Sequence, residues 1–340
     1  MRSFASDNNS GVHPNIMDAI VSANIEHSLG YGDDQWTQKA DEQIKSIFGE
    51  DIGIYYVFNG TGANVVSLQA TTQSFNSIIT AQTGHINLDE CGAPSKFTSC
   101  CLKEIQTKDG KLTCELIKPL LEGFGDPHHS QAKVIYLSQS TEMGTVYTPE
   151  DLRAICDLAH QHDMYVHMDG ARLANACAYL GLGMRELSRE CGIDILSLGG
   201  TKNGMMIGEL VISFRKELNT HLQYYRKQSA QLYSKMRYLS SQFSAYLKDD
   251  LWMANACHAN KMASVLEEKL RQFPFIEFTQ KVQANALFLI MPANIIEALR
   301  KKYFFYTWNE QTNEVRLVCS WDTSIDDIEG FIYCIDKQIK

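Results

Sequence analysis

The sequence lacks any long apolar run and any block of basic residues. No stretch approaches the ~20 apolar residues that a membrane helix needs. The N-terminal segment MRSFASDNNSGVHP has no apolar signal-peptide core. A net charge of −9 argues against nucleic acid and anionic membranes as partners. We therefore expect a cytoplasmic protein that binds neither nucleic acid nor membrane.

Metal-ligand spacings are also absent. The ten cysteines include no Cys-x-x-Cys pair, and Cys100 and Cys101 are adjacent. Most of the other cysteines lie in apolar helical patterns, where a thiol behaves as a small buried hydrophobe. The ten histidines are scattered, without the spacing of metal ligands. We expect reduced thiols and no metal site.

The chain is long enough for a large core and, as a first expectation, about two domains. Short apolar runs alternate with helical patterns, which is typical of an α/β fold. We predict a large domain over residues 1–245 with a mostly parallel sheet, and a smaller C-terminal α/β domain over 246–340. A long helical pattern over 218–271 is rich in Tyr, Leu and Met. This composition favours core packing or a subunit contact, so we expect an oligomer.

Residues 164–204 contain two strand-like runs that end on chemically active residues. Met164–Met168 ends directly on Asp169, and Ile193–Leu198 ends in two glycines followed by Thr201 and Lys202. Such runs are typical of buried strands in a parallel sheet. Ligands of these sheets bind beyond the carboxyl ends of the strands. We therefore expect Asp169 and Lys202 to face one crevice.

An acid and a lysine in one crevice suit pyridoxal 5'-phosphate. The lysine forms a Schiff base with the cofactor's aldehyde, and the acid pairs with the pyridinium nitrogen. Alone, such an aspartate is usually a helix cap and such a lysine is usually solvated. Their combination, with Arg172 three residues beyond Asp169, favours the cofactor site.

A glycine turn supplies a third anchor. The run Ile54–Phe58 reads as a strand, and Gly60 and Thr61 follow it just before a helix. This arrangement directs backbone N–H groups and the positive end of the helix dipole at one point, which suits a phosphate. The turn matches neither the P-loop nor Gly-x-Gly-x-x-Gly, and a glycine turn alone often serves only close packing.

Three further residues have two interpretations each. His85 follows the strand Ser77–Ala81 and is either a structural histidine or a ring that stacks on the cofactor. Glu142 lies in the turn after the strand Lys133–Ser138 and is either a plain turn residue or a group facing the crevice. Arg316 lies inside a strand, where burial without a partner is costly. It either points to solvent or binds a carboxylate bidentately.

Together these residues resemble the low-specificity L-threonine aldolases of the aspartate-aminotransferase-like, fold type I pyridoxal-phosphate enzymes. The resemblance covers nearly the whole chain. It is carried by Phe4-Ala-Ser-Asp7, Tyr31-Gly-Asp-Asp34, Phe58-Asn-Gly-Thr61, His85 with Asp89-Glu-Cys-Gly92, His167-Met-Asp-Gly-Ala-Arg172, Gly199-Gly-Thr-Lys-Asn203 and Val315-Arg-Leu317.

The resemblance implies roles for these residues. Lys202 would form the Schiff base, Asp169 would pair with the pyridinium nitrogen, and His85 would stack on the ring. Gly60, Thr61 and Arg172 would complete the cofactor site. The substrate contacts implied are Ser6, Tyr31, Arg172 and Arg316. It also implies a tetramer, a dimer of dimers with active sites at the subunit interface.

The implied reaction is cleavage of L-threonine, L-allo-threonine and related β-hydroxy-α-amino acids to glycine and an aldehyde. This would serve threonine catabolism and glycine biosynthesis. The alternatives are another fold type I lyase that works by β-elimination, and a non-enzymatic cofactor-binding protein. One branch of the family has a histidine where this chain has Glu142. We expect His85 to be the main proton-transfer group and Glu142 a secondary one, because an unperturbed histidine titrates nearer neutral pH.

Overall fold

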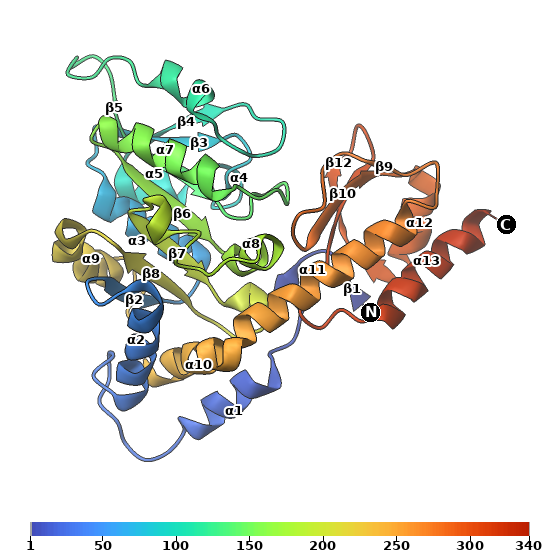
Figure 1. The fold of residues 1–340 in the computed structure, drawn as a ribbon, viewed down its shortest axis with the longest axis horizontal. Coiled ribbons are helices and arrows are strands. Elements are labelled where there is room, and N and C mark those ends of the chain that lie inside the picture. Colours follow the sequence, from blue (N-terminus) through green and yellow to red (C-terminus); the bar gives the residue numbers. More distant parts are fainter. Residues whose placement is uncertain (1, 340) are drawn as a thin grey trace.

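The computed structural model describes residues 2–339, and its centre is a seven-stranded sheet (Figure 1). The strand order is β2-β8-β7-β6-β5-β3-β4. Neighbours from β4 to β7 are parallel, whereas β8 is antiparallel to both β7 and β2. The bounds are β2 Gly53–Val57, β3 Asn76–Ala81, β4 Cys101–Ile105, β5 Gln131–Ser138, β6 Tyr165–Gly170, β7 Ile195–Gly199 and β8 Glu209–Ser213. The prediction of a mostly parallel sheet is confirmed.

Both faces of this sheet are covered, which explains why its strands are continuous apolar runs. Alternate residues of one strand join different hydrophobic clusters. Ile195 packs with helices α3 (Gly60–Thr71) and α9 (Lys216–Gln228). Its neighbour Leu196 joins the large core that includes α7, α8 and α10. The sheet therefore lies between two helical layers, as in other doubly covered α/β folds.

The other helices are α1 Pro14–Ser22, α2 Gln35–Phe48, α4 His85–Leu88, α5 Ala93–Thr98, α6 Cys114–Ile117, α7 Pro149–Gln161, α8 Leu173–Leu180, α10 Arg237–Leu247, α11 Leu251–Leu270, α12 Ala293–Arg300 and α13 Ile325–Ile339. The predicted helical stretch over 218–271 is thus divided among α9, α10 and α11. Ala230, Asp249 and Asp250 have positive φ angles of 58°, 52° and 53°. The left-handed region does not continue a right-handed helix, so the chain turns at these residues.

The C-terminal part forms a second, four-stranded antiparallel sheet of order β12-β13-β10-β9. Its strands are β9 Glu277–Phe278, β10 Ala286–Ile290, β12 Tyr306–Asn309 and β13 Glu314–Val318. Helix α11 contributes Trp252 and Ala256 to the large core, and Leu266 and Leu270 to the smaller one. A smaller C-terminal α/β unit is therefore present, whereas its exact division at residue 245 stays a prediction.

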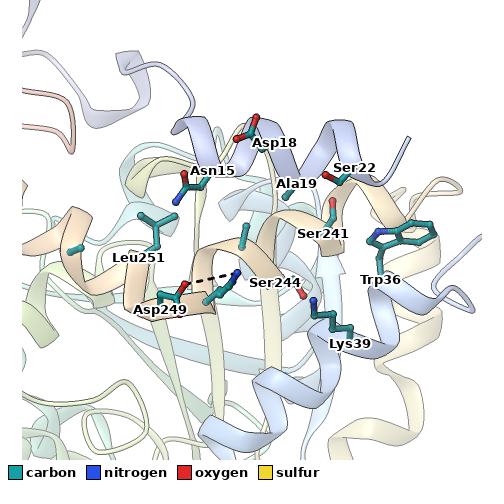
Figure 2. A pocket seen from close by; sticks show the side chains of 13 residues that line it. Asn15, Asp18, Ala19, Ser22, Trp36, Lys39, Ser241, Ser244, Asp249 and Leu251 are labelled. Carbon is teal, nitrogen blue, oxygen red and sulfur yellow. Dashed lines mark ion pairs between the residues drawn. The ribbon is translucent and has the colours of Figure 1, made fainter. Parts of the chain in front are cut away.

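A groove of about 600 Å³ separates α1 from α2 and α10 on the outside of the large core (Figure 2). Trp36 and Lys39 line it from α2, and Ser241 and Ser244 from α10. Apolar side chains of α1 and the segment after it remain uncovered nearby. They are Met17, Val21, Ile25 and Leu29, of which Val21 and Leu29 are 65% and 71% exposed.

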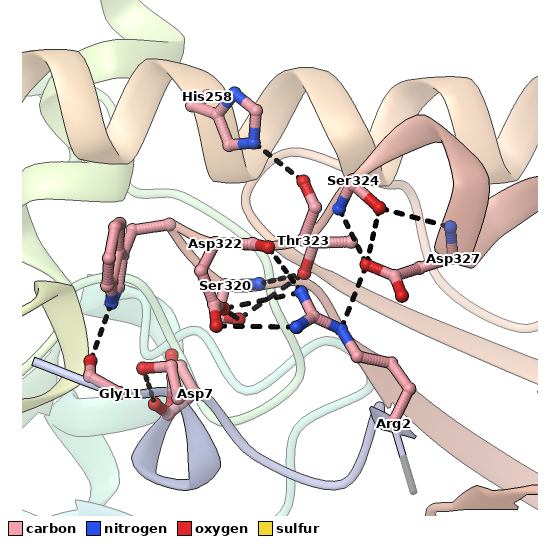
Figure 3. A network of polar contacts seen from close by, with 11 residues as sticks. Arg2, Asp7, Gly11, His258, Ser320, Asp322, Thr323, Ser324 and Asp327 are labelled. Atoms are coloured by element: carbon pink, nitrogen blue, oxygen red, sulfur yellow. Dashed lines mark hydrogen bonds and ion pairs between the residues drawn. The ribbon is translucent and has the colours of Figure 1, made fainter. Parts of the chain in front are cut away.

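The N-terminal arm crosses from the small sheet to the large one. Strand β1 (Arg2–Ser3) pairs in parallel with β11 (Tyr303–Phe304). Arg2 forms ion pairs with Asp322 and Asp327 (Figure 3). Later in the arm, the carbonyl of Gly11 accepts a hydrogen bond from the indole of Trp321. The N–H of His13 then donates to the carbonyl of Gly204, just past the Lys202 turn. This path carries the residues between β1 and His13 over the junction of the two sheets.

No helix within residues 2–339 is long and apolar enough to cross a membrane. In the same part of the chain, no group of three or more His, Cys, Asp or Glu side chains is arranged to hold a metal ion. All ten cysteines are free thiols.

Candidate active site

Polar residues gather at the carboxyl ends of the parallel strands. Asp169 is the penultimate residue of β6, and Lys202 lies in the single helical turn that follows β7. Glu142 follows β5, His85 begins α4 after β3, and Gly60 begins α3 after β2. Because β2 runs in the same direction as the parallel strands, all five residues lie at one edge of the sheet. The crevice predicted at this edge is therefore where these side chains meet.

Asp169 is buried and accepts three hydrogen bonds. Its Oδ2 accepts from Asn64 Nδ2 at 2.9 Å and from Tyr136 Oη at 2.7 Å. Its Oδ1 accepts from the backbone N–H of Ala171 at 2.9 Å. Burial opposes ionisation, but nearby His85 and these donors outweigh it and hold the pKa of Asp169 below its usual value. The residue is thus a fixed carboxylate at the strand end.

Lys202 is half-buried, and its amine forms no hydrogen bond or ion pair within residues 2–339. Burial, and then the charge of Arg172, lower the pKa of this amine. A lowered pKa favours the neutral, nucleophilic form of a lysine. The turn itself is rigid, since Asn203 Nδ2 donates to Tyr246 Oη and to the carbonyl of Trp252, both at 2.8 Å.

His85 is held on two sides. Its Nδ1 lies 2.8 Å from Glu90 Oε1, and its backbone N–H donates to Glu142 Oε1 at 2.8 Å. Burial opposes protonation of the ring, but the hydrogen bond to Glu90 and the charge of Asp169 raise the pKa of His85 overall. Its Nε2 has no partner in the described chain. The ring therefore has a fixed side at Nδ1 and an open side at Nε2.

Glu142 contacts His85 directly, through the backbone of the histidine. Its Oε1 accepts from the backbone of His85 and, at 2.6 Å, from Ser138 Oγ. Burial raises the pKa of Glu142. Oε1 thus accepts from two donors, one of them at the start of α4, whereas Oε2 has no partner in the described chain.

The glycine turn at β2 forms an open helix N-terminus. Asn59 caps α3 by accepting from the N–H of Gly62 at 2.8 Å, which leaves the N–H groups of Gly60 and Thr61 without an acceptor in the described chain. A Cβ added at Gly60 would meet nothing within 4 Å, so this side of the turn is open. Gln231, from the segment between α9 and α10, flanks the other side and accepts from the N–H of Phe58 at 2.9 Å.

Arg172 is already paired with a carboxylate of the chain. Its Nε and Nη2 donate to the two oxygens of Asp7, each at 2.8 Å. Asn285 Nδ2 adds a third hydrogen bond to Asp7 at 3.0 Å. Despite burial, Arg172 lowers the pKa of Asp7. Ser6 beside it caps the short turn that follows, accepting from the N–H of Asn8 at 3.2 Å.

Arg316, in contrast, has no carboxylate partner among the described residues. Its guanidinium lies 5.1 Å from the ring centre of Trp308, and its Nη2 donates to the carbonyl of Ala5 at 3.3 Å. Its Nε is buried without a partner. Burial, and then the charge of Arg172, lower the pKa of Arg316. The side chain is half-buried, so the interpretation that it simply points to solvent does not fit this placement.

Tyr31 stands apart from the other predicted residues. It is 55% exposed, and its ring lies under Lys227 at 5.6 Å. No contact with the crevice residues is formed in the part of the chain that the structure describes. Its role in substrate binding stays a prediction.

Four residues of this site were not predicted from the sequence: Asp7, Asn64, Glu90 and Tyr136. Asn64 left the clearest signal, because a buried asparagine among the apolar residues of α3 is costly unless it has hydrogen-bond partners. Asp7 and Glu90 lie in two of the motifs that carry the family resemblance but outside any strand end, so the strand-end pattern assigns them no role.

Comparison with known proteins shows the family of this chain. The family model described as "Beta-eliminating lyase" matches residues 3–293. A low specificity L-threonine aldolase from Pseudomonas aeruginosa is 42% identical over 96% of this chain and 94% of its own length. A second, from a Pseudomonas species, is 41% identical over 94% of this chain and 93% of its own.

The chain belongs to the low-specificity L-threonine aldolases.

The structural comparison extends this relationship to the whole fold. A threonine aldolase from Leishmania major superimposes with a TM-score of 0.94 at 29% identity, and each chain is covered completely. An alanine–glyoxylate aminotransferase from a Nostoc species matches at a TM-score of 0.72 and 11% identity, which shows the fold alone. The predicted family and the fold type I architecture of pyridoxal-phosphate enzymes are confirmed for this threonine aldolase family member.

Proposed function

We propose that this chain uses pyridoxal 5'-phosphate, held by Lys202 and Asp169, to cleave L-threonine and L-allo-threonine to glycine and an aldehyde. The observation that carries the proposal is the placement of two residues at the ends of adjacent strands: Asp169, a buried and ionised acid, and Lys202, a lysine without a hydrogen-bond partner among residues 2–339. The threonine aldolases that are 41% and 42% identical support this lyase reaction over β-elimination or simple cofactor binding.

The residues present fit the ring nitrogen, the aldehyde and the phosphate of the cofactor. Asp169 would face the pyridine nitrogen, Lys202 would attach to the aldehyde, and the free N–H groups of Gly60 and Thr61 would hold the phosphate. His85 would lie against the ring. Bound pyridoxal phosphate supplies the aldehyde that captures the substrate amine and the sink for the electron pair of the breaking Cα–Cβ bond.

Arg316 is the group best suited to the substrate carboxylate. It is a half-buried cation without an anionic partner, and its Nε is buried with no acceptor. Ser6 lies on the same arm as Ala5, whose carbonyl Arg316 already contacts. Arg172 has Nε and Nη2 occupied by Asp7, which leaves Nη1 for a ligand. A carboxylate fixed at Arg316 would orient the bond to be broken, which is catalysis by positioning.

His85 is the group we assign to the proton of the substrate's β-hydroxyl. Glu90 holds Nδ1, so the open Nε2 would accept that proton when His85 is neutral. A pKa near working pH suits this task. We assign Glu142 the secondary role, because its Oε1 anchors Ser138 and the backbone of His85 and only Oε2 is left to exchange a proton.

We also propose that four chains assemble in the cytoplasm as a dimer of dimers. The enzyme would act in threonine catabolism and glycine biosynthesis. Support for association comes from the uncovered apolar residues along α1 and the groove beside them (Figure 2). Exposed apolar patches of this kind mark contact surfaces.

Analysis of the products tests the reaction. The purified protein, supplied with pyridoxal phosphate and L-threonine, should release glycine and acetaldehyde in equal amounts. Release of ammonia and a keto acid instead would assign the chain to β-elimination and contradict the proposal.

A further inference from the structure

One buried carboxamide connects the two acids of the site. Asn64, on the second turn of α3, is fully buried. Its single Nδ2 donates to Asp169 Oδ2 at 2.9 Å and to Glu90 Oε1 at 2.8 Å. The two carboxylate oxygens are therefore no further apart than the sum of these distances. Buried carboxylates this close disfavour each other's ionised form unless donors lie between them.

The orientation of this carboxamide follows from its neighbours. Turning it over would place its carbonyl oxygen against two carboxylates. In the observed orientation, Asn64 Oδ1 accepts from Ser197 Oγ at 3.1 Å. The serine thus uses its only proton, and it must accept from His167 Nε2, which lies 2.9 Å away. Burial lowers the pKa of His167 to about 4, so this buried ring is neutral and carries its proton on Nε2.

These hydrogen bonds determine the tautomer of His85. Each of the two Nδ2 protons of Asn64 is donated to one acid, so Glu90 Oε1 accepts from Asn64 and also from His85 Nδ1. A carboxylate that holds the Nδ1 proton of an imidazole sets its tautomer and leaves Nε2 to accept a proton.

We propose that Asn64 and Glu90 are positioning residues: Asn64 holds Asp169 and Glu90 side by side as carboxylates, and Glu90 presents His85 Nε2 to the substrate hydroxyl. This inference deepens the proposed function and rests on it for the identity of the substrate. The hydrogen-bond arrangement itself belongs to the protein alone, so it is measurable without cofactor or substrate.

The two residues should shift the titration of His85 in opposite directions. In the proton-accepting form, neutral His85 lies beside the carboxylate of Glu90 and donates to it from Nδ1. Asn64→Leu removes a donor from that carboxylate and leaves more of its charge to stabilise protonated His85, so His85 should release its proton at higher pH. Glu90→Gln removes the negative charge, so His85 should release its proton at lower pH. Each shift should be on the order of one pH unit, as for loss of a hydrogen bond to a charged group.

The remaining charged groups around His85 stay in place in both variants. They are Asp169, which favours the protonated ring, and Lys202, which disfavours it. Glu142 also faces this residue through the backbone N–H. Asn64→Leu also removes a donor from Asp169, which acts on His85 in the same direction, whereas Glu90→Gln leaves that donor in place, so the Glu90 variant isolates the contribution of Glu90.

The experiment is an NMR titration of the cofactor-free protein with labelled histidine, with the His85 signal assigned by its loss in His85→Asn. Ser67→Ala is the matched control, because Ser67 is buried on the same helix and its Oγ has no partner. The control should leave the His85 midpoint unchanged. Asn64→Ala replaces Asn64→Leu if the larger side chain prevents folding, and circular dichroism checks each variant.

Opposite shifts in the Asn64 and Glu90 variants, with no shift in Ser67→Ala, would support the proposal. An unchanged or lowered midpoint in a folded Asn64 variant would overturn it, and so would an unchanged midpoint in Glu90→Gln. Failure of the threonine reaction with these shifts present would count against the proposed function alone. In the active enzyme, the acid limb of the kcat/KM profile should move in the same directions.

Discussion

Asp7 and Arg172 form a buried bidentate ion pair, although 165 positions separate them in the sequence. The aspartate arrives on the N-terminal arm, and the arginine begins α8 behind β6. This ion pair joins the arm to the active-site edge of the large sheet. Asn285, directly before β10 of the small sheet, donates to the same carboxylate, so Asp7 contacts segments of both sheets.

Asp7→Asn should destabilise the fold strongly. Breaking a buried pair leaves an uncompensated charge and costs roughly 3–5 kcal/mol. The exposed pair of Asp51 and Arg189 offers a matched control, because surface pairs contribute about 0–1 kcal/mol. Chemical denaturation of Asp7→Asn and Asp51→Asn measures both losses. Equal losses would show that the Asp7 pair contributes no more than a surface contact.

The same pair predicts acid sensitivity. The folded-state pKa of Asp7 lies below its unfolded value, which is about 4. Its stabilising contribution is therefore complete above that unfolded value and is lost as pH falls through the folded pKa. Denaturation curves below pH 4 should show a steeper loss of stability in the wild type than in Asp7→Asn. Parallel curves would contradict the assignment.

Arg316→Ala should raise KM for threonine and weaken glycine binding. A charge-assisted hydrogen bond contributes about 1.5–3 kcal/mol, so KM should rise roughly tenfold or more. Arg300→Ala is the control, since Arg300 is engaged by the ring of Phe305 at 5.4 Å and by the hydroxyl of Thr307. An unchanged KM in Arg316→Ala would mean that another cation binds the carboxylate.

His85→Asn should lose far more kcat than Glu142→Gln. The glutamine retains an oxygen that can accept from Ser138 and from the backbone of His85, so the histidine keeps its position. Both variants are assayed with threonine, and their cofactor content is measured. If Glu142→Gln loses more kcat while both retain cofactor, the order of the two residues is reversed.

Light scattering at micromolar concentration should give the mass of an assembly, with four chains as the expected number. Val21→Glu places a charge on the uncovered face of α1 and should weaken association. Phe75→Glu, directly before β3, alters a residue of similar exposure, 64%, and should not weaken association. A monomer mass for the wild type would refute the proposed assembly.

The strand-end residues could be predicted because their signal is local. Asp169 and Lys202 each follow a short apolar run closed by glycine, and parallel strands bring such ends together. The same logic applied to His85 and Glu142. The structure adds that Glu142 contacts the backbone of His85, which no pattern along the chain encodes.

Contacts between distant segments could not be predicted in this way. The pairing of Asp7 with Arg172 depends on the path of the arm across two sheets, and Gln231 reaches the Gly60 turn only because α9 ends near it. The sequence predicts one long helical pattern over 218–271, but left-handed backbone at Asp249 and Asp250 interrupts it. Apolar periodicity gives the buried face of a helix but not where the helix ends.

The central claim is that Lys202 carries the cofactor opposite Asp169. Borohydride reduction of the loaded protein, followed by digestion and mass spectrometry, tests it most directly. We predict a pyridoxyl-phosphate adduct on Lys202, and no adduct and no threonine cleavage in Lys202→Ala. Covalent cofactor on another lysine, or in Lys202→Ala after reduction, would contradict the account.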